Sequence, residues 1–385
     1  MVMTTVSEGN KAINFQKKVN KQYVREGVFG KYIGASENAV FQTNENIRKK
    51  SIPLIGKLSG DGVTGSSQLV GEEEALSNYD FVFEPTHYRN GVVIDNEERE
   101  KSEFDLYKEA RPALMNWIME RKRDQMIQSL AAVQAGGTYY NYGGAEVSGA
   151  NHSSAASAAN LDTWQAANSD RILYGNAKSN LTSGDHTTSL GTIDTTYDKL
   201  NVETIELLKR IAEDCNPLIR PIMLNGDEPF YVYFVGKYGF RDLRNDSAMQ
   251  SALREAMPRM KDNPLFSGGD LCWENVVIKK VPDMDKFIDS AGSGLWDGVW
   301  GANATGDSLA TSGNGGSRVG VGFLCGAQAV CFGRGKNASF KKRKEDDYEH
   351  MNGVAVAAKH DIKKIYYNGK QHGMVTHFHS ASLDN

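Results

Sequence analysis

The spacing of apolar residues predicts helices in two parts of the chain. From Phe104 to Leu130, apolar side chains recur every three or four residues, which is the period of one helix face. Asp95 is a suitable N-cap, and the acidic run EERE follows it, as is common in a first helical turn. The segment VETIELLKRIAED at 202–214 has the same apolar stripe. We therefore expect a long helix within residues 96–134 and a shorter one at 202–214.

Other segments show the patterns of β-strands. NYDFVF alternates apolar and polar residues at Tyr79–Phe83. PFYVYFVG at 229–236 and CWENVVIKKV at 272–281 are short apolar runs typical of buried strands. Residues 51–95 combine short apolar runs with glycine-rich turns, so we expect them to form a long two-stranded excursion. No βαβ repeat is visible, and the pattern indicates a mixed α+β fold.

Composition distinguishes three further segments. Residues 1–50 are polar with scattered apolar positions, which indicates an arm that packs on something else. Residues 135–200 contain no Pro, Met or Cys and are rich in Gly, Ala, Ser, Thr and Asn. They keep several aromatic residues, which pure linkers lack, so we expect an ordered insertion on the surface. A second glycine-rich loop is expected at 290–317.

Overall composition excludes several classes of protein. The chain has 385 residues, 40% of them hydrophobic, and a formal net charge of −4. These values favour a globular core over a disordered chain or a uniformly basic nucleic-acid platform. The longest uncharged apolar stretch, Val319–Phe332, is shorter than the ~20 residues needed to span a bilayer. The first residues lack the apolar segment of a signal peptide, and the four cysteines form no CxxC pair, so we expect reduced thiols.

Charged runs are best explained as surface features. ERKRD at 120–124 fits a solvated helix face, with contact to a neighbouring subunit as the alternative. The basic run at 341–344 is followed directly by EDD, which neutralises it and argues against a nucleic-acid patch. Glu72, Glu73 and Glu74 lie near the tip of the predicted excursion, where they suit pairing with a basic patch on another chain.

The sequence contains few candidates for catalysis or metal binding. Phosphate-loop, nucleophile-elbow, zinc-protease and dinucleotide motifs are all missing. His377 and His379 would point to one side of a strand, with His372 nearby and His360 as a further candidate ligand. Because no carboxylate or cysteine accompanies them at close spacing, we expect polar residues on a strand face. We thus predict no catalytic residue, no cofactor and no metal site.

Several segments, in this order, resemble the major capsid protein of tailed bacteriophages, specifically its N-four-like branch. The segment at 97–126 (EEREKSEFDLYKEARPALMNWIMERKRDQM) resembles the spine helix of that branch. YFVGKYGFRDLRNDSAMQSALREA at 233–256 and NPLFSGGDLCWENVVIKKV at 263–281 resemble its core. RVGVGFLCGAQAVCFGRG at 318–335 contains the GAQA segment, and EDDYEHMNGVAVAAKHDIKKIYYNG at 345–369 resembles the closing strands. The resemblance covers about residues 50–134 and 202–380, but not the island at 135–200.

The resemblance implies the α+β Johnson fold of tailed-phage capsids. The implied organisation is an N-terminal arm (1–50), an extended β-hairpin loop (51–95), a spine helix of the peripheral domain (96–134), a Gly/Ser/Asn-rich insertion (135–200), a peripheral core and axial domain (201–335), and C-terminal strands returning to the peripheral domain (336–385).

The function implied by the resemblance is self-assembly into hexamers and pentamers of an icosahedral shell. Such a shell is part of the virion, is assembled in the bacterial host cytoplasm, and encloses phage DNA without sequence-specific binding or membrane contact. Scaffolding, portal and decoration proteins are candidate partners. Two alternatives remain: an encapsulin-like compartment that holds an enzyme cargo, and a metal-dependent hydrolase that uses His372, His377 and His379.

Overall fold

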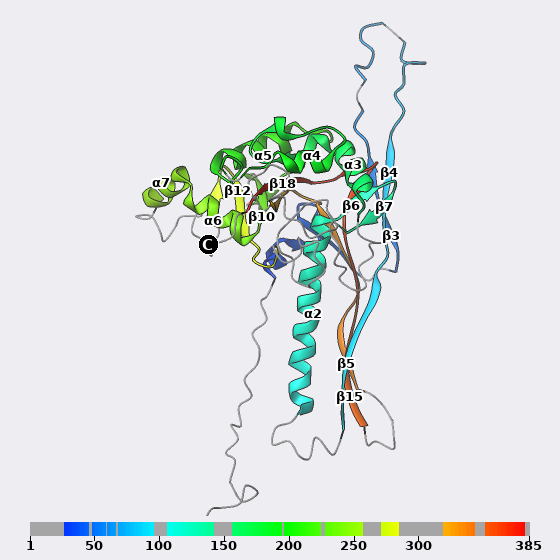
Figure 1. Cartoon of the computed structure of the whole chain (residues 1–385). Coiled ribbons are helices and arrows are strands. Elements are labelled where there is room, and N and C mark those ends of the chain that lie inside the picture. The colour runs from blue at the N-terminus through cyan, green and yellow to red at the C-terminus, as the bar shows by residue number, and fades with distance from the viewer. Residues whose placement is uncertain are drawn as a thin grey trace, which may run out of the picture.

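The computed structural model describes residues 27–45, 48–58, 60–66, 68–95, 106–141, 156–194, 196–224, 228–256, 271–284, 319–342 and 351–381. In Figure 1 these residues form a head in which helices cover a sheet, a long ribbon that runs away from the head beside one helix, and a thin projecting hairpin. Among the helices described, none is long and apolar enough to cross a membrane. Residues 1–26 of the predicted arm and the predicted loop at 290–317 lie outside the described residues.

A seven-stranded mixed sheet forms the centre of the head, in the order β11-β12-β10-β13-β18-β8, with β9 paired to β10. Its strands are β8 (Ile172–Tyr174), β9 (Ile222–Leu224), β10 (Glu228–Val235), β11 (Leu271–Trp273), β12 (Val276–Lys280), β13 (Val319–Cys325) and β18 (Met374–Ser380). All residues of β13 and β18 are buried. Alternate residues of β13 enter different apolar clusters, Phe323 on one face and Leu324 on the other, so the sheet separates two cores.

Five helices surround this sheet: α3 (Ala158–Ala167), α4 (His186–Gly191), α5 (Val202–Asp214), α6 (Lys237–Asn245) and α7 (Ser247–Ala256). Helix α5 begins at Val202, as the sequence predicts. Asn201 caps it, because its side chain accepts a hydrogen bond of 2.8 Å from the Thr204 backbone N–H. Its apolar stripe, which includes Ile205 and Leu208, is fully buried against the sheet. The predicted helix at 202–214 is therefore confirmed, as is the strand predicted at 229–236. The single strand predicted at 272–281 is wrong: Glu274 and Asn275, both with positive φ, form a turn there, and β11 folds back to pair with β12 in antiparallel register.

The ribbon is a five-stranded sheet in the order β1-β2-β14-β15-β5, with α2 along one face. Its elements are β1 (Ile33–Gly34), β2 (Phe41–Glu45), β5 (Thr86–Asp95), β14 (Val330–Lys342), β15 (Met351–Lys364) and α2 (Leu106–Ala131). Helix α2 has 26 residues and continues through Pro112. Ala110, Leu114 and Ile118, spaced by four residues, pack against Val354 and Val356 of β15. The long helix predicted from Phe104–Leu130 is thus present and packs on a sheet.

The projecting hairpin consists of β3 (Lys50–Ile55) and β4 (Asn78–Phe83), which pair in antiparallel register. The prediction that all of residues 51–95 form this excursion is wrong for its last part. Strand β5 pairs along its whole length with β15, from Asp95 opposite Met351 to Thr86 opposite His360. Alternation of apolar residues shows that a segment is a strand, but it does not select the partner strand, so local pattern could not separate β4 from β5.

The prediction that residues 135–200 form a surface insertion is wrong for residues 156–200. Strand β8 pairs in parallel with β18 of the central sheet. Trp164, Arg171 and Tyr174 are each at most 1% exposed. Small polar residues supply turns and backbone hydrogen bonds around these buried side chains, such as those from the Asn176 and Asp194 N–H groups to the Asp198 carboxylate. Residues 142–155 lie outside the described residues.

Two small two-stranded sheets complete the described elements. They are β6 (Val133–Ala135) with β7 (Thr138–Tyr140), and β16 (Tyr366–Tyr367) with β17 (Lys370–Gln371). Short 3-10 helices lie at Val28–Tyr32, Ser169–Arg171 and Lys178–Asn180. In the first of these, Phe29 is 1% exposed and its ring lies 5.1 Å from that of Phe234. The described end of the predicted arm is therefore part of the head core.

Candidate assembly surfaces

The base of the hairpin is fixed to the molecule by aromatic packing. Phe81 and Phe83, on the inward face of β4, are buried against Cys331, Ile365 and Tyr367. The alternate residue of β4, Val82, is exposed. One face of the hairpin is thus anchored where it leaves the ribbon, and the other faces solvent.

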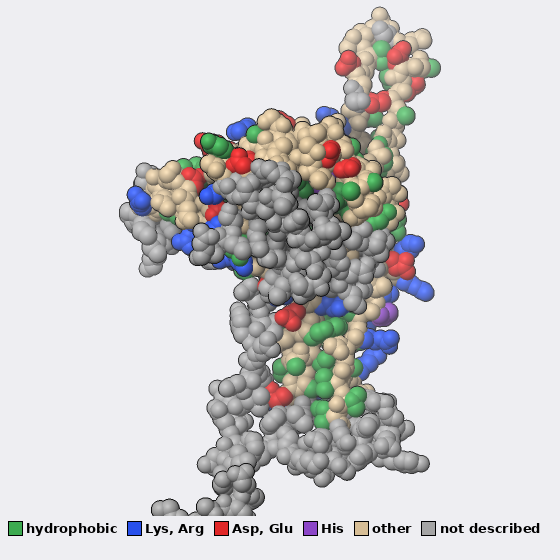
Figure 2. All heavy atoms as spheres, in the orientation of Figure 1, with side chains coloured by type: hydrophobic (Ala, Val, Ile, Leu, Met, Phe, Trp, Pro, Cys, Tyr) green, Lys and Arg blue, Asp and Glu red, His purple; other side chains and the backbone are tan. Residues whose placement is uncertain are grey.

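Beyond this base, the hairpin has no core of its own. Five large apolar side chains are each more than half exposed: Ile55, Leu58, Leu69, Val70 and Leu76. The most exposed, Val70, has 83% of its surface accessible. Figure 2 shows these apolar side chains together with acidic ones at the end of the hairpin. We call residues 55–77 the hairpin tip. Clustered exposed apolar groups of this kind mark interaction sites in soluble proteins.

Hydrogen bonds to backbone N–H groups shape the hairpin tip. The Glu74 carboxylate accepts from the Gly60 N–H at 2.7 Å, and that of Glu73 accepts from the Gly71 N–H at 2.7 Å. Gly71 has a φ of 95°, which a side chain would strain. Glu72 is exposed beside them, so the tip presents negative charge among its apolar groups.

A basic surface lies on the face of the ribbon opposite α2. His87, Arg89, Lys336, Lys341 and Lys359 project there, and we call them the basic ribbon face. His87 lies directly opposite Lys359, which lies opposite Lys336, so three basic residues cross three strands in register. All of them except Lys359 line a shallow cavity of about 290 Å³, together with Ala357 and Ala358. Figure 2 shows Lys, Arg and His side chains together along this edge. Facing cations in a sheet are unfavourable without a counter-charge.

The histidines predicted as the best metal candidates are buried parts of the core. The His377 and His379 rings lie 5.4 Å apart. His377 Nδ1 accepts a hydrogen bond from the Tyr233 hydroxyl at 2.8 Å, and its Nε2–H donates to the Gly175 carbonyl at 3.0 Å. Both ring nitrogens are thus used within the protein. Burial, chiefly, holds the pKa of both histidines below the usual value.

The other two candidate ligands lie among different partners, and His360 is buried whereas His372 is half-buried. His360 stacks on Tyr88, and its Nε2–H donates to the Gln125 side chain at 2.7 Å. His372 makes an edge contact with Tyr367. Burial lowers the pKa of His360 to about 3 and that of His372 to about 4. Within the described residues, no three His, Cys, Asp or Glu side chains are grouped to hold a metal ion.

Two buried basic residues that connect distant segments of the chain were not identified from the sequence. Lys364 is fully buried, and its Nζ donates to the Leu130 and Ala132 carbonyls at the end of α2, at 3.1 and 3.2 Å. Burial lowers its pKa to about 7. Arg171 donates from Nη1 to the Gln371 carbonyl and forms an ion pair with Asp170. No local sequence pattern distinguishes these two basic residues from residues on the surface.

Comparison with known proteins gives consistent results across the whole chain. A family model described as "Phage capsid protein" matches residues 3–379. The curated major capsid protein of Pseudomonas phage KPP25 is 26% identical over 351 residues, which are 88% of this chain and 86% of that protein. The solved capsid asymmetric unit of cyanophage Pam1 superposes over all of both chains with a TM-score of 0.84 and 30% identity. The capsid of Ralstonia phage GP4 also covers both chains fully, with a TM-score of 0.68 and 20% identity.

Proposed function

The chain belongs to the phage capsid protein family, and we propose that it closes into an icosahedral shell of hexamers and pentamers that encloses DNA. Its relatives are major capsid proteins, so this chain is a structural protein of the virion that self-associates in the head shell, and not an enzyme. The mixed α+β structure is a Johnson-type capsid fold. Because the chain belongs to this family, the alternatives of an encapsulin-like compartment and of a metal-dependent hydrolase are dropped.

The exposed apolar groups of the hairpin tip are the observation that carries this proposal. A two-stranded hairpin alone is marginally stable in water, and this tip has no apolar cluster to cover Leu69 or Val70. In our proposal the tip lies over an adjacent copy of the chain, which buries these side chains. The hairpin then corresponds to the extended loop of the fold, α2 with the ribbon to the spine helix and peripheral domain, and much of the head to the axial domain.

The basic ribbon face is the surface that best complements the tip in charge. The tip carries Glu72, Glu73 and Glu74, whereas His87, Arg89, Lys336, Lys341 and Lys359 share the ribbon face. The two surfaces are different parts of one chain, so each copy offers one to the next copy and the contact is heterologous. Contacts of that type close into rings when the rotation between copies allows, as hexamers and pentamers require. Charge complementarity of this kind selects partner and register.

Three finer parts of the proposal depend on the family resemblance alone. They are membership of the N-four-like branch, assembly in the bacterial cytoplasm, and the use of scaffolding, portal or decoration proteins. Electron microscopy of the purified chain, alone and with candidate partners, tests which proteins are required for closed shells.

A charge exchange tests the proposed contact between copies. Glu72→Lys and Arg89→Glu should each reduce the yield of shells seen by electron microscopy, because each brings like charges together. The double variant should recover part of the yield. Glu203→Lys, which reverses an exposed charge on α5, is the control and should assemble normally. A double variant that is no better than either single variant would contradict the contact, and an unsubstituted chain that forms no shells would contradict the proposed function.

A further inference from the structure

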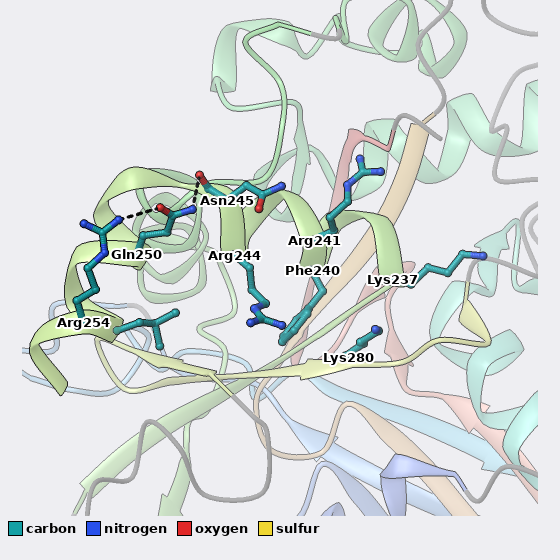
Figure 3. A pocket seen from close by; sticks show the side chains of 9 residues that line it. Lys237, Phe240, Arg241, Arg244, Asn245, Gln250, Arg254 and Lys280 are labelled. Atoms are coloured by element: carbon teal, nitrogen blue, oxygen red, sulfur yellow. Dashed lines mark hydrogen bonds between the residues drawn. The ribbon is translucent and has the colours of Figure 1, made fainter. Parts of the chain in front are cut away.

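A second basic site lies in the head, in a cavity of about 430 Å³ between α6, α7 and the end of β12. Figure 3 shows the side chains that line it. Five of them are cationic and none is acidic: Lys237, Arg241, Arg244, Arg254 and Lys280, with Phe240, Asn245, Gln250 and Leu253. The whole chain has a net charge of −4, so this concentration of positive charge is a local feature and not a consequence of composition.

The sequence of α6 places these cations on one side of the helix. Lys237, Arg241 and Arg244 are spaced by four and three residues, whereas Phe240 and Leu243 are largely buried against the sheet. Like charges at this spacing destabilise a helix. Within α6 the acidic residue is Asp242, which forms an ion pair with Arg241 at 2.8 Å. Asp246, directly after α6, accepts hydrogen bonds from the backbone N–H groups of Val202 and Ala248. An anion that enters the cavity would reduce the repulsion between the cations of α6.

The cations differ in how they are held. Arg254 Nη2 contacts the Gln250 side chain at 3.5 Å, and the Lys280 ammonium lies 6.0 Å from the centre of the Phe240 ring. In Figure 3, Arg244 and Lys280 lie on either side of Phe240, and Arg254 projects from the neighbouring helix α7. Arg244, Arg254 and Lys280 are exposed to solvent. Two guanidinium groups and an ammonium group on different elements thus face one open cavity.

We propose that this cavity binds phosphate groups of the enclosed DNA backbone. Guanidinium groups match the geometry of phosphate oxygens and bind them through paired hydrogen bonds. Among the described residues that line the cavity, the cations are on side chains that can reach phosphate oxygens, and contacts to the DNA backbone carry no sequence information, so binding would be independent of base sequence. This inference rests on the proposed function, because it requires a shell that contains DNA.

The observations favour phosphate over the acidic hairpin tip of another copy. In our proposal the acidic tip lies on the basic ribbon face of an adjacent copy, so each head cavity is left for another anion. Among the described residues, Phe240 and Leu253 are the apolar lining of the head cavity. A strongly acidic ligand group that needs little apolar surface fits this lining.

Binding of a labelled 12-base-pair duplex by the full-length unassembled chain tests the inference. Arg244→Ala/Arg254→Ala should weaken binding at least tenfold. Loss of two phosphate contacts should reduce the slope of log affinity against log salt by about 1.8. Arg89→Ala/Lys341→Ala removes the same charge from the ribbon and should leave both quantities close to those of the unsubstituted chain. Unchanged thermal melting of both variants shows that they are folded.

Two competitors identify the source of the anion. Tripolyphosphate should displace the duplex only at a higher concentration of phosphate groups, and a peptide of residues 68–77 should not displace it. Tighter binding of tripolyphosphate would assign the cavity to free polyphosphate, and displacement by the peptide would assign it to another copy; either result overturns the inference. Equal weakening of duplex binding by Arg244→Ala/Arg254→Ala and by Arg89→Ala/Lys341→Ala would also overturn the inference.

The inference and the proposed function fail in different ways. Normal shells from Arg244→Ala/Arg254→Ala with unchanged duplex affinity would overturn the inference and leave the proposed function intact. Absence of shells from the unsubstituted chain would overturn the proposed function, whatever the duplex result.

Discussion

The head and the hairpin differ in where their apolar side chains are placed. In the head, both faces of β13 and β18 are covered, and Phe323 and Leu324 enter separate cores. In the hairpin, Phe83 at the base is 1% exposed and Val70 at the tip is 83% exposed. The head buries its apolar surface within one chain, whereas in our proposal the hairpin tip buries its apolar surface against another copy. Folding of the subunit and assembly of the shell are therefore supported by different regions, and substitutions should separate them.

The largest effect is expected in α2, where it packs on the ribbon. Ile118→Asp should prevent folding of the subunit, because an unpaired buried charge costs several kcal/mol. Met119→Asp is the matched control, since Met119 is 37% exposed and Ile118 is 1% exposed. Circular dichroism and thermal melting of the purified variants measure the difference. A folded Ile118→Asp subunit with unchanged melting would show that α2 does not depend on this contact.

A smaller but still large effect is expected from Trp164→Ala in the head. Trp164 is 1% exposed, and loss of a buried tryptophan side chain lowers the free energy of unfolding by about 3–5 kcal/mol. Val70→Ala at the hairpin tip should change the unfolding free energy of the unassembled subunit by less than about 0.5 kcal/mol. Urea unfolding of both variants makes the comparison. Equal values would mean that the distinction between the two regions is wrong.

The segment around Trp164 also shows where sequence analysis failed. Replacing residues 145–190 with a Gly/Ser linker, which the predicted surface insertion would tolerate, should abolish folding, because it removes Trp164, Arg171 and Tyr174. The average composition of this segment is dominated by small polar residues, so it did not reveal that these three side chains are buried. Helix α5 was predictable, in contrast, because its apolar stripe has a helical period and all of its packing lies on one face.

Long-range partners explain the remaining failures. The contact of Lys364 with Leu130 joins residues separated by 234 positions. The pairing of β5 with β15 joins residues that are even farther apart in the sequence. Local periodicity placed His377 and His379 on one strand, but Tyr233 and Gly175, the hydrogen-bond partners of His377, come from elsewhere in the chain. The exposed tip was found correctly as a segment with little core, since that property is local.

Mild acidification, to about pH 5, should destabilise the head and ribbon through their buried histidines. The hairpin tip contains no histidine between residues 55 and 77. The folded-state pKa values of His186 and His360 are lowered to about 3, and that of His372 to about 4, mainly by burial. The unfolded chain therefore binds protons first as the pH falls. The stability due to each histidine is complete above about pH 6.5 and decreases below it by about 1.4 kcal/mol per pH unit, down to the folded-state pKa.

Urea unfolding of the subunit at pH 7 and pH 5 measures this effect. His360→Gln keeps a donor for Gln125 and removes one titrating group, so its loss of stability on acidification should be smaller by about the contribution of one histidine. A variant with the same pH dependence as the unsubstituted chain would show that burial of His360 does not control this part of the profile.

A small effect on subunit stability is also expected from Leu69→Ser/Val70→Ser at the tip. Both side chains are exposed, so the unfolding free energy of the subunit should change by less than about 0.5 kcal/mol per residue. The yield of shells should nevertheless fall strongly, because these groups are the ones to be buried between copies. Leu218→Ser, at an exposed leucine of the head, is the control. Sedimentation of assembly mixtures separates subunits from shells.

Hydrogen exchange, compared between free subunits and assembled shells, tests the central claim most directly. Backbone N–H groups of residues 55–77 should exchange rapidly in subunits and slowly in shells. Those of β13 and β18 should be protected in both states, because the head buries them within one chain. Equal exchange of residues 55–77 in subunits and shells would contradict the account, since the hairpin tip would then not be the region covered by a neighbouring copy.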